Sequence, residues 1–192
     1  LFKNNSINHL AIIMDGNARY AKKNKIISKN GYLAALNSSG DLLNVNAKNG
    51  RVIWSLNTTG SLLAHDTDFW KSSDIIMDDN NIIFSTPSSI FSYRLDKGYF
   101  NWKQNINTKN TPIIDGNNVF VVSDNGYFVN LDKNSGEIIF STNILKVLKK
   151  RKQLTEISGY IMGSGKIYTT TTNGHLIVSS ATSGKVEYFR KI

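Results

Sequence analysis

The chain alternates short apolar segments with turns rich in Asn, Asp, Gly and Ser over most of its length. Within the apolar segments, hydrophobic and polar residues alternate with a period of two, which is typical of β-strands with one face in a core. Segments such as "NAKNGRVIW" and "DKNSGEIIF" place a glycine in the turn between two strands, where a tight hairpin needs a positive φ. The pattern therefore predicts an all-β protein built from antiparallel hairpins.

Four of these hairpins align with one another. Each carries an aromatic residue in its second strand and a glycine in its turn: Trp54, Trp102, Phe140 and Tyr188, with Gly50, Gly98, Gly136 and Gly184. A second apolar hairpin precedes each one, as in "IIMDDNNIIFS" and "PIIDGNNVFVVS". The repeating unit is thus four antiparallel strands, which is typical of a propeller blade. We predict four blades at about residues 25–57, 73–106, 111–143 and 158–191.

The predicted blades fill residues 25–192 and leave residues 1–24 as an N-terminal appendage. One blade cannot bury both of its faces alone, so we expect each repeated aromatic to pack against the neighbouring blade. A β-sandwich has similar strand spacing, but it gives no reason for the aromatic and the glycine to recur together. Four blades would form half a ring or a fragment of a larger propeller, whose open blade edges favour self-association.

The repeats "VNAKNGRVIWS", "LDKNSGEIIFS" and "SATSGKVEYFR" resemble the pyrroloquinoline-quinone-type propeller repeat, and within that superfamily the family of the outer-membrane assembly factor BamB. Members of that family have about eight blades. The resemblance implies a non-enzymatic periplasmic scaffold, associated with the outer membrane, that binds a protein partner in the β-barrel assembly machinery. It implies no cofactor.

The same superfamily contains quinoprotein dehydrogenases, which gives an enzymatic alternative. Those enzymes are expected to carry a vicinal cysteine pair, a catalytic Asp and acidic calcium ligands, whereas this chain has no cysteine. Most of its Asp residues lie at turns or at the Asp position of the repeat itself. We therefore expect no bound pyrroloquinoline quinone.

The segment from about residue 7 to residue 24 contains "HLAIIMDGNARYAKKN", which resembles the first signature of cis-prenyltransferases, the undecaprenyl diphosphate synthase family. The resemblance implies a catalytic, Mg²⁺-associated Asp15, with Gly16, Asn17 and Arg19 holding the diphosphate. Amides at a helix N-terminus and a guanidinium group both favour phosphate oxygens. Asp15 and Arg19 are the catalytic candidates, and Mg²⁺ is expected only if this enzymatic interpretation holds.

The later motifs of the prenyltransferase family have no counterpart, because propeller repeats fill the place where they would lie. "AIIMDGNARYA" also aligns with the first hairpins of two blades, so a strand running into a turn is an alternative interpretation. We expect residues 1–24 to derive from a prenyltransferase-like segment joined to the propeller, without retained catalysis. Isoprenyl diphosphate transfer is the alternative to the favoured protein-binding function.

The formal net charge of +9 raises the question of a nucleic-acid partner. The positive charge is concentrated in residues 1–30 and in the run "LKVLKKRKQ", which has no aromatic residue that could stack on bases. We therefore expect no nucleic-acid binding and interpret the basic residues 146–152 as a solvated loop. Contact with an acidic partner or an anionic lipid surface is the alternative.

The remaining polar clusters give one candidate contact loop. His65, Asp66, Asp68 and Trp70 lie between the first two predicted blades, in a connection that a propeller presents on one face. A capped turn is the alternative interpretation of this segment. The three histidines of the chain have no partners at a spacing that predicts a catalytic triad or a zinc site.

No transmembrane stretch or signal peptide is evident, and the chain starts with Leu1 instead of Met. We expect the 192 residues to be a processed product or a fragment, without the signal or lipid anchor that a periplasmic lipoprotein needs. The periplasmic, outer-membrane-associated location therefore rests on the resemblance alone.

Overall fold

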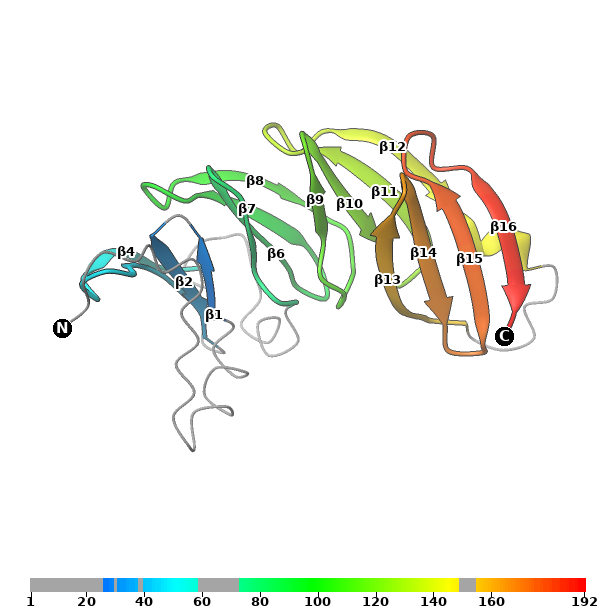
Figure 1. The fold of residues 1–192 in the computed structure, drawn as a ribbon, viewed down its shortest axis with the longest axis horizontal. Helices are drawn as coiled ribbons and strands as arrows, with labels where there is room; N and C mark the ends of the chain where they lie inside the picture. The colour runs from blue at the N-terminus through cyan, green and yellow to red at the C-terminus, as the bar shows by residue number, and fades with distance from the viewer. Residues whose placement is uncertain (1–25, 30, 38–39, 59–72, 149–154) are drawn as a thin grey trace.

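The computed structural model of the chain describes residues 26–29, 31–37, 40–58, 73–148 and 155–192. These residues form four sheets, which follow one another along the molecule in chain order (Figure 1). Each sheet has four strands, and within a sheet each strand pairs antiparallel with the strands next to it in sequence. The prediction of an all-β chain with four antiparallel, four-stranded blades is confirmed.

Every sheet is a meander in which short connections join consecutive strands. The first sheet contains β1 (Ile26–Lys29), β2 (Tyr32–Leu36), β3 (Asp41–Asn46) and β4 (Val52–Asn57). The second contains β5 (Ile76–Met77), β6 (Asn81–Ser85), β7 (Ile90–Arg94) and β8 (Phe100–Gln104). The third contains β9 (Ile113–Asp115), β10 (Asn118–Val122), β11 (Tyr127–Asp132) and β12 (Ile138–Asn143). The fourth contains β13 (Ile157–Gly163), β14 (Lys166–Thr171), β15 (His175–Ser180) and β16 (Val186–Lys191).

Each sheet has an irregularity at the same place, where the third strand pairs with the fourth. The register shifts directly after the pair that contains the repeated aromatic: Asn44 with Trp54, Ser92 with Trp102, Asn130 with Phe140, and Val178 with Tyr188. A bulge at such a point re-aims the neighbouring side chains. The four aromatics therefore occupy one structural position.

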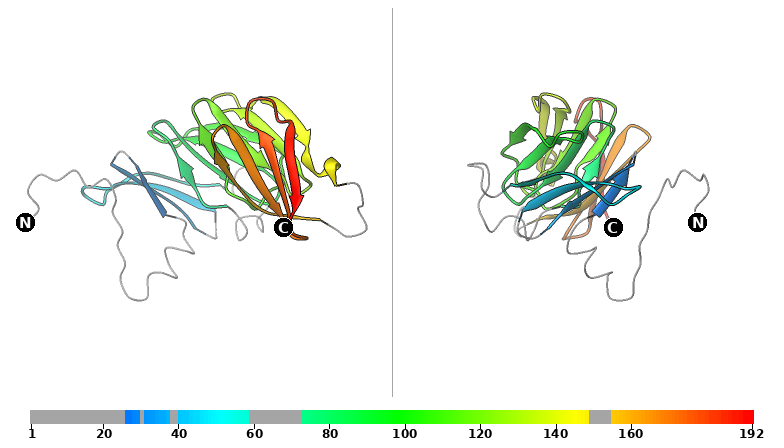
Figure 2. Two further views of the ribbon diagram at one scale, coloured as in Figure 1. Left: turned by 45° about the vertical axis from the view of Figure 1, so that its right-hand side comes forward. Right: turned by 90° about the vertical axis from the view of Figure 1, so that its left-hand side faces the viewer.

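Apolar residues on the facing sides of neighbouring sheets form three buried clusters, one for each pair of neighbours. Leu42 and Phe84 belong to the cluster between the first and second sheets, and Phe128 and Ile177 to the one between the third and fourth. Strand β6, in a sheet covered on both faces, is buried along its whole length. Figure 2 shows the sheets stacked face to face along the row.

The fourth strand of a sheet is its exposed outer strand, as the patterns of β4, β12 and β16 show. Apolar residues there remain 42–58% exposed just after the turn glycine: Val52, Ile53, Phe100, Ile138 and Ile139. Single exposed apolar residues are ordinary on a protein surface. Their recurrence at the same positions of three blades is a feature of the fold.

A 3-10 helix, η2 (Ile144–Val147), follows the third sheet. Ile144 and Leu145 are buried, whereas Lys146, the first residue of the basic run, is exposed. Residues 149–152 of that run lie outside the described residues, so its interpretation as a solvated loop stays a prediction. The appendage 1–24 also lies outside them, and the predicted boundary at residue 24 stays a prediction.

Candidate functional site

The turn between the third and fourth strands is built by local hydrogen bonds. In the third sheet, Gly136 N–H donates to the Asp132 carbonyl at 2.8 Å, and the Asp132 side chain accepts two further N–H groups of the turn. Asn46 and Ser180 stand at the equivalent position in the first and fourth sheets. Gly136 has a φ of +74°, a conformation that other residues adopt only with strain. The sequence of the turn thus fixes where its glycine lies.

Three of the turn glycines, Gly98, Gly136 and Gly184, each receive the repeated aromatic of the preceding sheet. A Cβ added to Gly136 would lie 2.6 Å from the Trp102 ring, and one added to Gly98 would lie 2.7 Å from the Trp54 ring. Only glycine therefore allows the ring and the turn to approach so closely. Trp102 Nε1 also donates to the Lys133 carbonyl at 2.8 Å, which satisfies two polar groups between the sheets.

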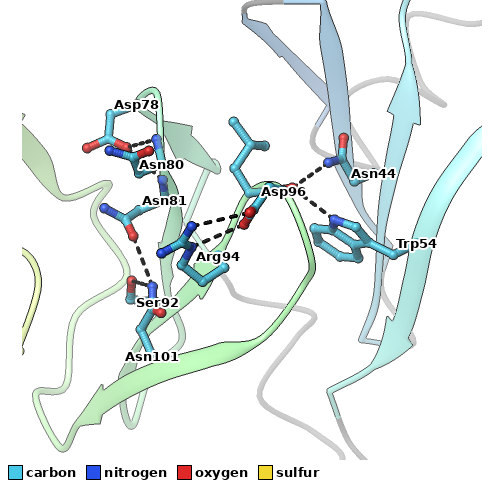
Figure 3. Close-up of polar contacts among 10 residues, drawn as sticks. Asn44, Trp54, Asp78, Asn80, Asn81, Ser92, Arg94, Asp96 and Asn101 are labelled. Atoms are coloured by element: carbon cyan, nitrogen blue, oxygen red, sulfur yellow. Dashed lines mark hydrogen bonds and ion pairs between the residues drawn. The ribbon is translucent and has the colours of Figure 1, made fainter.

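The contact between the first and second sheets has one additional donor (Figure 3). The Leu95 carbonyl accepts hydrogen bonds from Trp54 Nε1 at 2.8 Å and from Asn44 Nδ2 at 2.6 Å. Asn44 is fully buried, so this bond compensates part of the cost of removing its amide from water. The nearby Arg94–Asp96 ion pair is exposed and contributes little to stability.

The contact between the third and fourth sheets lacks the hydrogen bond. A Cβ on Gly184 would lie 2.6 Å from the Phe140 ring, yet a phenyl ring has no N–H to donate. Phe140 packs edge-on against Phe128, with ring centroids 5.3 Å apart. The aromatic position therefore keeps its steric match to glycine even where the hydrogen bond is absent.

The two ends of the row hold the unmatched halves of this contact. Tyr188, the aromatic of the fourth sheet, is 50% exposed because no described sheet lies beyond it. Gly50, the turn glycine of the first sheet, has a φ of +70° and no atom within 4 Å of the position of a Cβ. The expectation that each aromatic packs against a neighbouring blade therefore applies within the described chain to Trp54, Trp102 and Phe140.

Among the described residues, an ion pair crosses between the second and third sheets with both side chains largely buried. Asp78 Oδ2 lies 2.7 Å from Lys133 Nζ, and the two side chains are 14% and 15% exposed. Burial alone would raise the pKa of Asp78, but the Lys133 ammonium and the N–H groups of Asn80 and Asn81 outweigh it and hold the pKa below its usual 3.8. The ionised form of Asp78 therefore stabilises this interface.

The candidate enzymatic residues and the candidate contact loop lie outside the described residues. These are Asp15, Gly16, Asn17 and Arg19, and the loop residues His65, Asp66, Asp68 and Trp70. Among the residues that the structure describes, no group of three or more His, Asp or Glu side chains is arranged to hold a metal ion. In the same part of the chain, no helix combines the length and hydrophobicity needed to span a membrane.

Sequence reasoning found the aromatics and the glycines but missed the polar residues between sheets. Nothing in the local sequence of Asp78 or Asn44 indicates a partner in another blade. The exposed apolar positions did leave a signal, because Val52 and Ile138 each stand two residues after the turn glycine of their repeat. Comparing the residues two places after the turn glycine across the aligned repeats would have revealed these apolar positions.

Four antiparallel sheets, stacked face to face and joined by aromatic–glycine contacts, define the chain as a β-propeller protein. The sequence profile of one family, described as outer membrane protein assembly factor BamB, matches residues 15–142, more than half of the 192 residues. The chain belongs to this family. A comparison with curated proteins gave no match.

Solved structures agree on the fold. BamB from Moraxella catarrhalis matches with a TM-score of 0.64 and 18% identity, over 84% of this chain and 47% of that chain. The quinohemoprotein alcohol dehydrogenase from Comamonas testosteroni matches with a TM-score of 0.64 and 14% identity, over 87% of this chain and 35% of that chain. The C-terminal WD40 domain of Sif2 matches with a TM-score of 0.61 and 13% identity, over 88% of this chain and 45% of that chain. The chain thus spans about half the length of the BamB and WD40 structures and about a third of the dehydrogenase.

Proposed function

We propose that the chain is a non-enzymatic scaffold that binds a protein partner. The observation that carries the proposal is the match of residues 15–142 to the BamB family, on a chain that folds as four propeller blades. Propellers of this kind present rigid surfaces on which loops and outer strands can bind other proteins. The role requires no cofactor, and we propose that the chain binds neither Mg²⁺ nor pyrroloquinoline quinone.

The exposed outer strands provide a candidate contact surface. Val52 and Ile53 in β4, and Ile138 and Ile139 in β12, are 42–58% exposed. The exposed charged residues Arg51 and Glu137 stand directly before these pairs, so polar groups border the apolar ones. Apolar positions rimmed by polar residues are typical of protein–protein contact sites.

We further propose that the partner belongs to the outer-membrane β-barrel assembly machinery and that the chain works in the periplasm beside the outer membrane. The description of the family supports this proposal. The loop residues His65, Asp66, Asp68 and Trp70 are the second candidate contact. Cell fractionation of a tagged full-length protein tests the location, and recovery in the cytoplasm would contradict it.

The partner is tested by measuring binding of the purified chain to purified components of the barrel-assembly machinery, for example by biolayer interferometry. The double substitution Ile138→Ser and Ile139→Ser is expected to weaken binding about tenfold, because apolar contact area is lost while the strand stays paired. Asn117→Ser, an exposed polar change in another turn of the same sheet and outside the proposed surface, is the matched control and should bind as the unaltered chain does. Absence of binding to every component refutes the partner, and unchanged binding of the double variant refutes the surface.

The N-terminal motif favours isoprenyl diphosphate transfer as a second candidate function. It would use Asp15 with Mg²⁺, and Gly16, Asn17 and Arg19 at the diphosphate. An assay with farnesyl and isopentenyl diphosphates and Mg²⁺ compares the chain with Asp15→Ala. We expect both to show only background turnover. Turnover that disappears in Asp15→Ala would establish the enzyme in place of the scaffold.

The quinoprotein alternative is tested in the same way. The chain contains no cysteine, so the vicinal pair expected of those enzymes is missing. We expect no dye-linked alcohol oxidation after incubation with pyrroloquinoline quinone and Ca²⁺. Oxidation that depends on the added quinone would contradict the proposal.

A further inference from the structure

The contacts between neighbouring sheets follow one rule. The side of each sheet that carries the aromatic covers the opposite side of the next sheet, and the aromatic meets the turn glycine there. In the third sheet, Phe120 and Phe128 lie on the aromatic side and are buried by the fourth sheet. On the other side of that sheet, Val121 and Leu131 are buried by the second. Interior sheets are therefore covered on both faces.

The fourth sheet carries an apolar face where this rule predicts a further neighbour. Tyr168, Leu176 and Val178 occupy positions equivalent to Phe120, Phe128 and Asn130, and Tyr188 is equivalent to Phe140. Ile161, paired with Tyr168 on the same face, is 68% exposed, and Tyr188 is 50% exposed. Tyr168 and Leu176 are only half-buried. This face, the leading face, has the residues of an inter-blade contact and no described blade upon it.

The first sheet carries the complementary face. Leu33, Ala35, Leu43 and Val45 occupy positions equivalent to Val119, Val121, Val129 and Leu131 of the third sheet. The four residues of the third sheet are at most 3% exposed, whereas those of the first sheet are half-buried. The exposed Gly50 lies at the corresponding turn, with space where the other turn glycines hold a ring. This face is the trailing face.

We propose that two copies of the 192-residue chain associate head to tail, the leading face of each on the trailing face of the other, and close a ring of eight blades. Tyr188 of one copy would then pack on Gly50 of its partner, twice per ring. Each new contact continues the contact that the chain already makes three times between its own sheets. The first and fourth sheets lie at opposite ends of the row, so one copy does not join its own ends (Figure 1).

The geometry favours closure at two copies over an open filament. A head-to-tail contact gives a closed ring when the rotation that relates one copy to the next adds up to a full turn. The contact proposed here would relate the end sheets of two copies by the same rotation that relates neighbouring blades within one copy. One copy matches 47% of the length of a BamB chain, so two copies together match nearly the length of one such chain. A closed ring of two copies also buries the leading and trailing faces of both copies, whereas an open chain of copies leaves one apolar face exposed to water at each of its ends.

Size-exclusion chromatography with light scattering tests the association on the unaltered chain. The mass of one copy is 21.4 kDa, and twice this value, 42.8 kDa, is expected. A mass of one copy at all accessible concentrations overturns the proposal. A mass that grows with concentration beyond two copies overturns the closed ring.

Two substitutions locate the contact. Gly50→Ala places a methyl group where the Tyr188 ring would lie. At the other three turn glycines, an added Cβ would be only 2.6–2.7 Å from the ring of the packed aromatic. Gly116→Ala is the matched control, because Gly116 also has a positive φ (+57°) and no atom within 4 Å, but lies in the third sheet away from both end faces. We expect Gly50→Ala and Tyr188→Ala to elute with the mass of one copy and Gly116→Ala with the mass of two. Circular dichroism confirms that each variant is folded, and equal masses for the Gly50 and Gly116 variants overturn the assignment.

A mixing experiment separates this contact from other modes of association. In an equimolar mixture, Gly50→Ala supplies an intact Tyr188 and Tyr188→Ala supplies an intact Gly50, so one of the two contacts is restored. The mixture is expected to regain a mass near two copies, although each variant alone does not. Absence of recovery at concentrations where the unaltered chain is fully paired overturns the head-to-tail arrangement.

Discussion

Replacing Gly136 by Ala tests the aromatic–glycine contact that joins the sheets. The added Cβ would lie 2.6 Å from Cγ and Cδ2 of Trp102 and 3.0 Å from its Cβ, so the ring or the turn must move. Overpacking of this kind costs about 1–3 kcal/mol. The φ of +74° adds about 1–2 kcal/mol for any L-residue. The free energy of unfolding should therefore fall by about 2–5 kcal/mol in total.

Gly116→Ala isolates the contact from the backbone strain. Gly116 lies in the same sheet with a φ of +57°, and nothing stands within 4 Å of its Cβ position. It should lose only the strain contribution, about 1–2 kcal/mol. The assay is urea denaturation followed by circular dichroism, with thermal melting as a second measurement. The melting temperatures should differ by about 2–4 °C for each kcal/mol that separates the variants. Equal losses would refute the view that the ring requires a glycine beneath it.

Three further substitutions test polar groups between the sheets. Asp78→Asn should lower the free energy of unfolding by about 1.5–3 kcal/mol at neutral pH. The pKa of Asp78 in the folded chain lies below its usual 3.8, so the ion pair contributes fully to stability above pH 3.8 and is lost as the pH falls through the folded-state pKa. Urea titrations at several pH values should show the difference in unfolding free energy between the unaltered chain and Asp78→Asn shrinking as the pH falls. A difference that stays constant with pH would contradict this role of the ion pair. Trp102→Phe should cost about 1 kcal/mol more than Trp54→Phe, because the Leu95 carbonyl keeps its bond from Asn44 when the Trp54 indole is removed. Equal urea midpoints and slopes for the two Phe variants would contradict this account.

The sequence allowed the repeat to be recognised because the residues that specify it are local. A turn such as "DKNSGE" needs glycine for its backbone and Asp132 to cap its N–H groups, and both requirements are met within a few residues. The aromatic lies a fixed number of residues further on, so its position in the fourth strand could also be predicted. The period-two alternation supplied the strands.

The partners across the sheets could not be predicted from the sequence. Asp78 and Lys133 belong to turns of different blades, and neither turn differs in composition from turns without an ion pair. Asn44 stands where Ser92, Asn130 and Val178 stand in the other blades, so the repeat does not reveal its bond to Leu95. Which polar groups meet depends on the angle at which one sheet packs on the next.

The sequence by itself determined the blades: the number of hairpins, the turn glycines and the aromatic in each outer strand follow from local backbone chemistry and alternation. Tertiary structure alone decided which blade faces are buried. Trp102 and Tyr188 are equivalent in the repeat, yet one is 5% exposed and the other 50%, because a neighbouring sheet covers only the first. Burial depends on what packs above a side chain, and that information does not lie in the segment that carries it.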